Sequence, residues 1–502
     1  MRALLSVHDK SGLVELAAGL VDLGWELVAS GGTASALGGA GLPHRQVAEV
    51  TGSPEMLGGR VKTLHPRIHG GILADRSLDT HRADLEAQGI DPIDLVVCNL
   101  YPFASDPSVE LIDVGGPTMV RSAAKNFAHV GVVTSPDDYP AVLGELRASG
   151  ALSDGTRRRL ARAAFAHTAA YDAAIVGWLD GDDPLPATIH LTLERAEVLR
   201  YGENPHQRGA RYRVAGGASW WDGAVLHSGT ALSYVNVFDA DAAWRLLHEL
   251  AGDAGDRPAT VIVKHANPCG AAVAEDLQTA YQRALDADPM SAFGGIVALG
   301  GPVTAAVAEV VAAGPQADVV VAPSFAPEAV ERLAKRRKAT RLLSAPPPEP
   351  VRRQVRTLGS AALVQEGDGF PAAPAGWQVV TAAAPTEGQW RDLVLAWRLC
   401  GRTTSNAVAV VRDGQAVGVG AGQQSRVVAA ELAVAKAGDR AKGGAGASDA
   451  FFPFPDGLEV LARAGVAAVV QPGGSVRDGE VVAAADAAGM AMVTTGERHF
   501  RH

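Results

Sequence analysis

The sequence predicts an α/β protein whose first region is built on a parallel β-sheet. Short apolar runs alternate there with helical patterns, which is the signature of parallel α/β structure. The chain has 502 residues, or about three domain-sized units at roughly 150 residues each. Hydrophobic residues make up 47% and charged residues 20%, so a wholly disordered chain and a coiled-coil rod are both disfavoured.

Apolar runs predict the strands of the first region, at residues 3–7, 25–29, 95–98 and 130–134. A helical stripe at residues 13–21, ended by Gly24, follows the first of these strands. The stretch 180–186, DGDDPLP, is acidic and proline-rich and lacks periodicity. We therefore expect a first domain over residues 1–185.

A second α/β region is expected over residues 195–502. Its strand candidates lie at residues 260–263, 295–299, 318–322, 407–411, 417–419, 467–470 and 491–494. Residues 412–415, RDGQ, predict a hairpin turn, and residues 345–350, APPPEP, predict an extended surface connection. The length leaves room for two similar subdomains, divided near residues 345–375.

The charge balance argues against nucleic acid as a partner. Lys and Arg number 45 against 55 Asp and Glu, a formal charge of -10, so any anion site must be built locally. Three cysteines are too few for a disulfide framework, which fits a reducing cytoplasm. No uninterrupted apolar run approaches the length of a membrane span, so we expect a cytoplasmic protein.

A glycine-rich turn after the second strand is the first candidate anion site. Residues 30–33, SGGT, offer close backbone approach, two hydroxyl donors and a helix N-terminus. Lys10, after the first strand, would lie on the same edge of the sheet. The alternatives are a plain strand-to-helix turn and a solvated lysine.

Residues 58–66, GGRVKTLHP, bring two further cations into the first region. Arg60 and Lys62 lie two residues apart and would face one anion from an extended backbone. His65 and His69 have a spacing that would suit a metal, but Pro66 disfavours a helix through both and no acidic third ligand lies near in sequence. We predict no metal site.

Three further side chains could move protons. Tyr101 follows the strand at 95–98, Asp113 precedes Gly115 and Gly116, and Lys125 lies on the helix that follows. A phenol, a carboxylate and an amine suit proton transfer, and the alternative is that they are polar groups at the rim.

The second region holds a stronger constellation at the end of the strand near residue 262. Lys264 and His265 are adjacent there, before a Pro/Gly break, so an imidazole could accept a proton and an ammonium could stabilise a carbonyl oxygen. Arg200 and Tyr201 in residues 199–207 suit a polar ligand. Arg426 could grip a phosphate or carboxylate, whereas Phe451 offers apolar contact or is ordinary core.

The sequence lacks the residues that a zinc-deaminase site or a dinucleotide site would require. Pro268 and Cys269 look like the start of a zinc-deaminase ligand string, but the second cysteine position is Ala272 and no His-x-Glu motif precedes it. Residues 418–422 have the spacing G-x-G-x-G rather than G-x-G-x-x-G, so a dinucleotide site is rejected.

The ordered strings SGGT (30–33), GGRVKTLHP (58–66), NLYPF (99–103) and AAKN (123–126) resemble the inosine monophosphate (IMP) cyclohydrolase domain of the bifunctional purine biosynthesis family. That domain is methylglyoxal-synthase-like. The strings VIVKHANPCG (261–270), SAFGG (291–295), TSNA (404–407), SDAFFPF (448–454) and QPGGSVRD (471–478) resemble the family's aminoimidazole carboxamide ribonucleotide (AICAR) transformylase domain. This resemblance implies two cytidine-deaminase-like subdomains without zinc.

The resemblance implies two consecutive reactions. The second region would transfer a formyl group from the cosubstrate 10-formyltetrahydrofolate to AICAR, and the first would close the formylated product, FAICAR, into IMP with loss of water. Neither step calls for a metal or a redox cofactor. Family members generally form homodimers, so small molecules and a second copy are the expected partners.

The resemblance also implies roles for individual residues. In formyl transfer His265 would be the general base and Asn406 would orient the carboxamide. Lys264 would stabilise negative charge or donate a proton to the folate leaving nitrogen. In cyclisation the catalytic positions are Lys62, Tyr101, Asp113 and Lys125. The remaining positions are the substrate-binding Lys10, Ser30, Gly31, Gly32, Thr33, Arg60, Thr63, Asn99, Gly115, Gly116, Arg200, Tyr201, Arg426 and Phe451, and the folate-binding Asp318, Pro453 and Asp456.

Two alternatives stand beside this hypothesis. One is a methylglyoxal-synthase-like lyase domain fused to a non-catalytic nucleotide-binding region. The other is a nucleotide-sensing scaffold that has lost catalysis, although the matched positions all hold chemically competent residue types.

Overall fold

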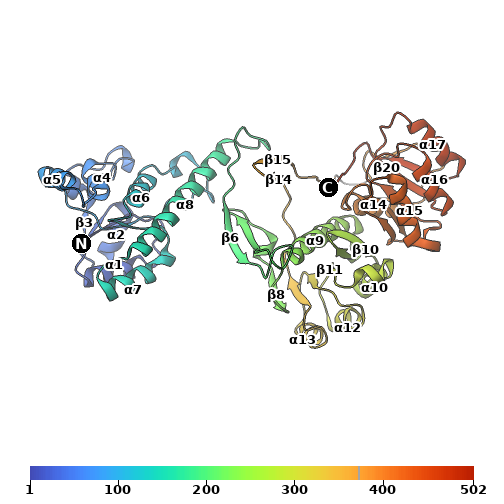
Figure 1. The fold of residues 1–502 in the computed structure, drawn as a ribbon, viewed down its shortest axis with the longest axis horizontal. Helices are drawn as coiled ribbons and strands as arrows, with labels where there is room; N and C mark the ends of the chain where they lie inside the picture. Colours follow the sequence, from blue (N-terminus) through green and yellow to red (C-terminus); the bar gives the residue numbers. More distant parts are fainter. Residues whose placement is uncertain (371–373) are drawn as a thin grey trace. The chain divides into compact units, whose positions relative to one another are not determined.

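The alternating strands and helices fold, in the computed structural model, into two compact units (Figure 1). The structure describes residues 1–370 and 374–502. Unit 1 comprises Met1–Leu193 with Val214–Gly216, and unit 2 comprises Glu194–Arg213 with Gly217–His502.

Unit 1 contains a five-stranded parallel sheet in the order β3-β2-β1-β4-β5. Its strands are β1 (Arg2–Leu5), β2 (Glu26–Ala29), β3 (Arg45–Gln46), β4 (Leu95–Val97) and β5 (Gly131–Val133). Its helices are α1 (Leu13–Asp22), α2 (Gly31–Gly39), α3 (Val47–Thr51), α4 (Pro66–Leu73), α5 (Asp79–Gln88), α6 (Gly115–Lys125), α7 (Tyr139–Ser149) and α8 (Asp154–Leu179). The predicted parallel α/β architecture of this region is confirmed.

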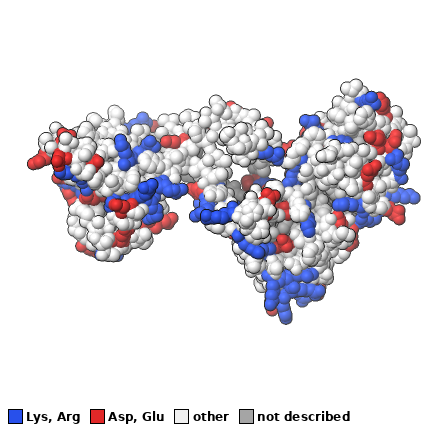
Figure 2. Space-filling model, viewed as in Figure 1, with Lys and Arg blue, Asp and Glu red and all other residues white. Residues whose placement is uncertain are grey.

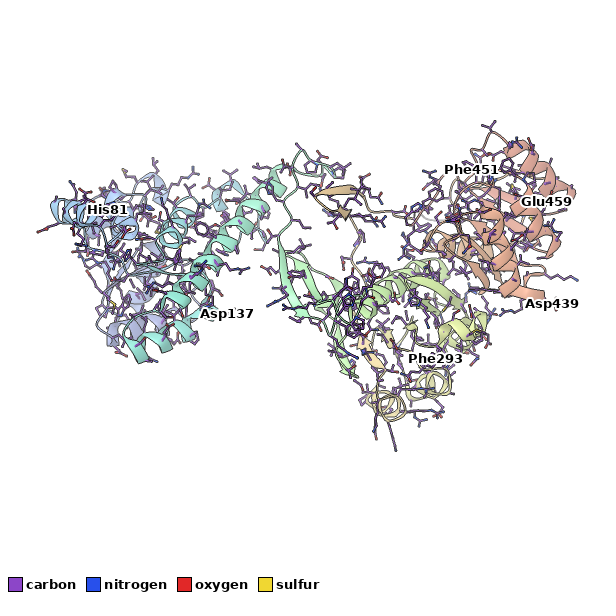
Figure 3. All side chains as sticks on the ribbon, viewed as in Figure 1. His81, Asp137, Phe293, Asp439, Phe451 and Glu459 are labelled. Atoms are coloured by element: carbon purple, nitrogen blue, oxygen red, sulfur yellow. The ribbon has the colours of Figure 1, made fainter. Side chains whose placement is uncertain are left out.

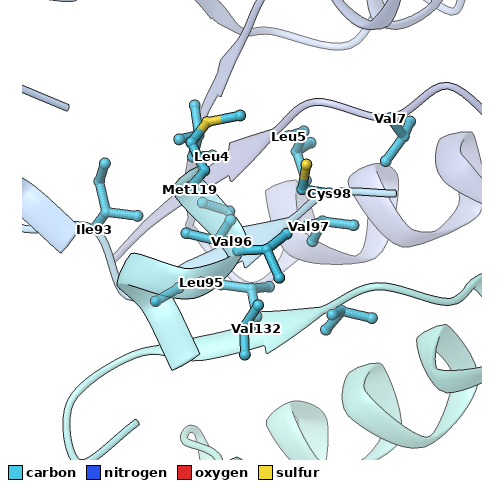
Figure 4. Packing of buried hydrophobic residues seen from close by; sticks show 14 of the residues in the cluster. Leu4, Leu5, Val7, Ile93, Leu95, Val96, Val97, Cys98, Met119 and Val132 are labelled. Atoms are coloured by element: carbon cyan, nitrogen blue, oxygen red, sulfur yellow. The ribbon is translucent and has the colours of Figure 1, made fainter. Parts of the chain in front are cut away.

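The core of unit 1 explains why its strands read as continuous apolar runs. Leu4, Val96 and Val132 lie in register on neighbouring strands, and each is at most 1% exposed (Figure 4). A parallel sheet is covered by helices on both faces, so residues of both orientations along a strand must be apolar. This packing fixes the carboxyl ends of β1, β2 and β4 at one edge, where loops bearing polar residues follow.

Unit 2 contains, within the described residues, a twelve-stranded mixed sheet and two separate two-stranded ribbons, β6 with β7 and β14 with β15. The strands are β6 (Leu193–Val198), β7 (Ala210–Val214), β8 (Val225–Ser228), β9 (Ala259–Lys264), β10 (Asn267–Val273), β11 (Ile296–Leu299), β12 (Val319–Ala322), β13 (Arg341–Ser344), β14 (Arg353–Leu358), β15 (Ala361–Glu366), β16 (Gln378–Val379), β17 (Val408–Arg412), β18 (Gln415–Gly420), β19 (Ala445–Ser448), β20 (Ala468–Gln471) and β21 (Ala491–Thr494). The helices are α9 (Tyr234–Ala254), α10 (Leu277–Ala287), α11 (Pro289–Ala292), α12 (Ala305–Ala313), α13 (Pro327–Arg336), α14 (Glu387–Gly401), α15 (Arg426–Ala437), α16 (Asp456–Arg463) and α17 (Asp478–Ala487).

The large sheet is a structural repeat. Its order is β16-β21-β20-β19-β17-β18-β10-β9-β11-β12-β13-β8, and reading outward from the central β18–β10 pair gives the same series on both sides. An antiparallel hairpin comes first, then an antiparallel neighbour, two parallel strands and an antiparallel edge strand. The first half therefore runs from β8 to β13 and the second from β16 to β21.

The structure of unit 2 differs from one sequence prediction and agrees with another. The Pro/Gly break predicted after His265 is instead a strand, β10, because its register shifts between Pro268 and Gly270 and so accommodates the proline. Residues 345–350 carry no regular secondary structure, as predicted. The predicted division near 345–375 includes the β14–β15 ribbon, and its residues 371–373 lie outside the described residues.

Charge is distributed unevenly over the surface. Lys and Arg gather around the end of α13, where Lys335 and Arg336 occupy the last turn, although the whole chain carries a net charge of -10 (Figure 2). Among the described residues, no helix is both long and apolar enough to cross a membrane.

Glycines allow two helices to lie close against the central hairpins. A Cβ on Gly270 of β10 would collide with the carbonyl oxygen of Ala284 in α10. A Cβ on Gly418 or Gly420 of β18 would likewise meet carbonyl oxygens of α15. Both halves of the repeat thus depend on glycine at the strand nearest the centre of the sheet.

Gly418→Ala is therefore expected to lower the free energy of unfolding of unit 2 by about 1–3 kcal/mol, because the helix must shift away from the strand. Chemical denaturation followed by tryptophan fluorescence measures this change. Gly252→Ala is the control, since Gly252 lies in α9 and a Cβ added there would have no atom within 4 Å. Alanine at this position should stabilise the helix by up to about 1 kcal/mol. Equal effects of the two substitutions would contradict the packing argument.

Candidate functional site

A cradle for an anion lies at the N-terminus of α2, at the carboxyl edge of the unit 1 sheet. A Cβ on Gly31 would lie 3.1 Å from Lys62 Nζ, and one on Gly32 would lie 3.5 Å from Lys10 Nζ, so both ammonium groups lie against this turn. Ser30 precedes the helix with extended backbone, and its buried hydroxyl has no hydrogen-bond partner among the described residues. Two cations, free helix N–H groups and an unpaired hydroxyl together suit a phosphate.

Neighbouring side chains hold the loop that carries Lys10. Asn99 Oδ1 accepts hydrogen bonds from the backbone N–H groups of His8 (2.6 Å) and Asp9 (2.9 Å). The Thr33 hydroxyl accepts from the Val7 N–H at 2.9 Å and donates to the Val7 carbonyl oxygen at 3.1 Å. Asn99 and Thr33 were expected to bind substrate. In the structure their side-chain oxygens instead bond to the backbone of this loop and position it.

Asp113 lies beside the cradle, at the N-terminus of α6. Burial raises the pKa of its carboxyl, and this effect is opposed by the N–H groups of Gly116 and Gly115 and by the Lys62 ammonium. The Gly116 N–H donates to Asp113 Oδ1 at 2.8 Å. This carboxyl therefore keeps its proton to a higher pH than an exposed aspartate does.

Tyr171 of α8 fixes the backbone before Asp113. Its hydroxyl donates to the carbonyl oxygen of Leu111 at 2.5 Å and accepts from the Asp113 N–H at 2.8 Å. Sequence reasoning missed this tyrosine, because 58 residues separate it from Asp113 and no local pattern links the two.

The other predicted residues of unit 1 differ in their exposure and in their contacts. Tyr101 is 38% exposed and makes an edge contact with His8. Thr63 is buried, and its hydroxyl lies 2.9 Å from a Cβ position on Gly115. Arg60 is exposed and paired with Glu110 at 2.5 Å. Lys125 is the exposed last residue of α6, about 15 Å along the helix axis from Gly115.

The second candidate site is built on the β9–β10 hairpin of unit 2. Lys264 is the last residue of β9, and His265 and Ala266 form a two-residue turn with φ of 53° and 55°. The Lys264 ammonium donates to the carbonyl oxygen of Phe293, which is labelled in Figure 3. The adjacent Lys and His are thus presented at the tip of a hairpin.

A cavity of about 400 Å³ opens beside this turn and is lined by both halves of the sheet. From the first half come Lys264, His265, Asn267, Pro268, Cys269 and Ser291, and from the second come Val419, Ala421, Leu432 and Lys436. Burial raises the pKa of Cys269 to about 12, so its thiol is a poor nucleophile at neutral pH.

Asn406 lies in a neighbouring cavity of about 270 Å³, with Gln423, Gln424, Phe500 and His502 among its walls. Its amide donates to the Gln423 carbonyl oxygen at 2.8 Å, and its Oδ1 accepts from Arg426 at 2.7 Å. Arg426 is buried and also pairs with the fully buried Asp449. In this state the guanidinium orients Asn406.

The remaining predicted residues of unit 2 lie before β8 and in both halves of the repeat. Arg200 lies over the ring of Tyr201, 5.1 Å from its centroid, and Asp318 accepts a hydrogen bond from the Asn236 amide at 3.3 Å. Phe451, labelled in Figure 3, is half-buried in the second half, and Pro453 and Asp456 are exposed. Residues 1–370 and 374–502 contain no cluster of three or more His, Cys, Asp or Glu that could hold a metal ion.

Comparison with known proteins defines the class. The family described as "AICARFT/IMPCHase bienzyme" matches residues 123–436, and the "MGS-like domain" matches residues 12–126. The curated protein named "Bifunctional purine biosynthesis protein PurH" from Myxococcus xanthus is 50% identical over 100% of both chains. Proteins of the same name from Sorangium cellulosum and Deinococcus radiodurans are each 49% identical over 100% of this chain and 99% of theirs.

A solved structure titled "Crystal structure of ForH" is 42% identical and covers 36% of this chain and 98% of its own, with a TM-score of 0.34. At this TM-score the match carries no weight for the fold.

The fold and the family matches define a two-activity enzyme with a methylglyoxal-synthase-like first domain. The chain belongs to the bifunctional purine biosynthesis family, which combines AICAR formyltransferase with IMP cyclohydrolase. It transfers a formyl group to AICAR, with a formyl folate as cosubstrate, and closes FAICAR to IMP. The full-length matches favour this function over a lyase domain fused to a non-catalytic region.

Tyr171→Phe is expected to loosen the segment before Asp113, because it removes the hydroxyl that bonds to the Asp113 N–H and to the Leu111 carbonyl oxygen. Hydrogen exchange of the Asp113 amide should accelerate by about tenfold, and the rate of FAICAR cyclisation should fall while formyl transfer is unchanged. Tyr139→Phe, which removes a hydroxyl from α7 in the same unit, is the control. Unchanged exchange in Tyr171→Phe would show that the hydroxyl does not hold the loop.

Proposed function

We propose that the two reactions are carried out at two separate sites, cyclisation in residues 1–185 and formyl transfer in residues 195–502. The proposal is supported by two compact units, each with its own cluster of predicted residues. The same-order repeat of the large sheet supports our further proposal that the second region consists of two cytidine-deaminase-like subdomains that act without zinc.

In formyl transfer, the 5-amino group of AICAR attacks the formyl carbon of 10-formyltetrahydrofolate. His265 accepts the proton of the attacking amine, and Lys264 stabilises the negative charge on the formyl oxygen and then supplies a proton to the departing folate nitrogen. Asn406 orients the carboxamide of AICAR. The observation that carries this proposal is the cavity of about 400 Å³, which is lined by Lys264 and His265 together with residues from the second half of the repeat.

Substrate contacts in unit 2 are assigned by residue type and place. Arg200, Tyr201, Arg426 and Phe451 bind the nucleotide, with Arg426 acting partly through Asn406. Asp318, Pro453 and Asp456 bind the folate.

In cyclisation, the carboxamide nitrogen of FAICAR attacks the formyl carbon and the former formyl oxygen leaves as water. The cradle of Ser30, Gly31 and Gly32, with Lys10, binds the phosphate, and Thr33 and Asn99 hold the loop around it. Gly115 and Gly116 lie at the reacting end of the substrate, where their N–H groups hold the Asp113 carboxyl, and Thr63 directs a hydroxyl toward the substrate there. Lys62, Tyr101, Asp113 and Lys125 move the protons, and Arg60 adds positive charge at the rim.

The enzyme acts as a cytoplasmic homodimer on small-molecule substrates, without nucleic acid, membrane, metal or redox cofactor as partners. The net charge of -10 supports the exclusion of nucleic acid. Sedimentation velocity at micromolar concentration tests the dimer.

The two sites should be separable by mutation. His265→Ala is expected to lower formyl transfer by about 10²–10⁴-fold, the usual contribution of a general base, and to leave cyclisation of supplied FAICAR intact. Lys62→Ala should do the reverse. Separate assays with 10-formyltetrahydrofolate plus AICAR and with FAICAR alone measure the two rates, and a folded variant that loses both activities would count against two independent sites.

Ser30→Ala should weaken substrate binding in the cyclisation site, because the buried hydroxyl is free to donate to a phosphate oxygen. We expect the KM for FAICAR to rise by about tenfold with little change in kcat. Ser35→Ala is the matched control, since Ser35 lies on the same helix and its exposed hydroxyl bonds to the Gly31 carbonyl oxygen. A KM that does not move in Ser30→Ala would remove this serine from the phosphate site.

A further inference from the structure

The turn that carries His265 is strained. Both His265 and Ala266 adopt the left-handed region, with φ of 53° and 55°, where a Cβ atom is unfavourable. Two-residue hairpin turns of this kind normally use Asn-Gly or Asp-Gly. The equivalent β17–β18 turn in the second half follows that preference, with Asp413 and Gly414.

Every backbone polar group of the strained turn is bonded to a side chain. The carboxylate of Asp239 in α9 accepts from the N–H groups of His265 (3.1 Å) and Ala266 (2.8 Å). The Asn267 amide donates to the His265 carbonyl oxygen at 3.0 Å, and Arg501 donates to the Ala266 carbonyl oxygen at 2.7 Å. Of these three residues, Asp239 alone bonds to both residues of the turn.

We propose that Asp239 is a positioning residue for formyl transfer, holding the imidazole of His265 in place through the two amides of its turn. Asp239 is 5% exposed, so its carboxylate lies in a low-dielectric setting where two N–H bonds are strong. The inference rests on the proposed function, in which His265 is the general base. The strained conformation persists because surrounding side chains bond to all of its backbone polar groups, and strain held in this way is typical of functional sites.

The second half of the repeat supplies a matched control. Asp392 of α14 accepts from the N–H groups of Asp413 (2.8 Å) and Gly414 (2.7 Å), and it is buried to the same degree as Asp239. Burial raises the pKa of both carboxyls. The two aspartates thus share their structural role, but the turn held by Asp392 carries no candidate catalytic residue.

The test compares Asp239→Asn, Asp392→Asn and His265→Ala in the full chain. Asparagine keeps the shape but presents an N–H₂ group to one of the two amides. In Asp239→Asn we expect kcat for formyl transfer to fall by about 100-fold, the effect of a misplaced catalytic group, with the KM for AICAR within about threefold of native. Asp392→Asn should lose comparable thermal stability and keep its native kcat.

A second substitution separates positioning from general destabilisation. Ala266→Gly removes the Cβ penalty of the left-handed turn, so in the Asp239→Asn background it should restore kcat by about tenfold without reaching the native value. If Asp239→Asn alone does not fold, the double variant carries the test, and a native kcat in it would overturn the proposal.

The remaining outcomes are also decisive. A native kcat in Asp239→Asn, or an equal loss of kcat in Asp392→Asn, would overturn the positioning role while a loss in His265→Ala preserves the proposed function. A native rate in His265→Ala would instead overturn the proposed function of the site.

Discussion

The pairing of β10 with β18 is the constraint on which unit 2 depends. It joins two copies of the same six-strand arrangement into one sheet, with Ala272 opposite Gln415. Because each copy ends at the centre in a hairpin, the junction places the β9–β10 turn and the residues after β18 around one cavity. Glycines at positions 270, 418 and 420 let the flanking helices approach these strands closely. The proposed formyl transfer site thus lies at the junction and takes residues from both halves.

In unit 1 the candidate anion site depends on the carboxyl edge of the parallel sheet. A parallel sheet buried on both faces directs three loops to one edge, and a helix N-terminus there supplies unpaired N–H groups. Lys10 and Lys62 reach that edge from different parts of the sequence. Positive charge is therefore concentrated locally in a protein that is negative overall, as binding of a phosphorylated substrate requires.

The repeat also shows how one structural device serves two purposes. Asp239 and Asp392 hold equivalent turns, yet Asp413 and Gly414 suit the left-handed conformation and His265 and Ala266 do not. The strained turn occurs where the proposed general base, His265, lies. Local sequence preference is given up at that position and the surrounding side chains compensate for it.

The sequence by itself determined the α/β class, four of the five strands of the unit 1 sheet and most strands of the large sheet, and it supplied the candidate site residues. These features depend on local periodicity and on strings of neighbouring residues, which a single chain displays directly. Only the tertiary structure decided that β10 is a strand despite Pro268, that the Arg426 guanidinium bonds to Asn406, and that Asp239 and Tyr171 hold the loops of the two sites. Each of those contacts joins residues that are distant in sequence or overrides a local preference, so it exists only once long-range packing has brought the elements together.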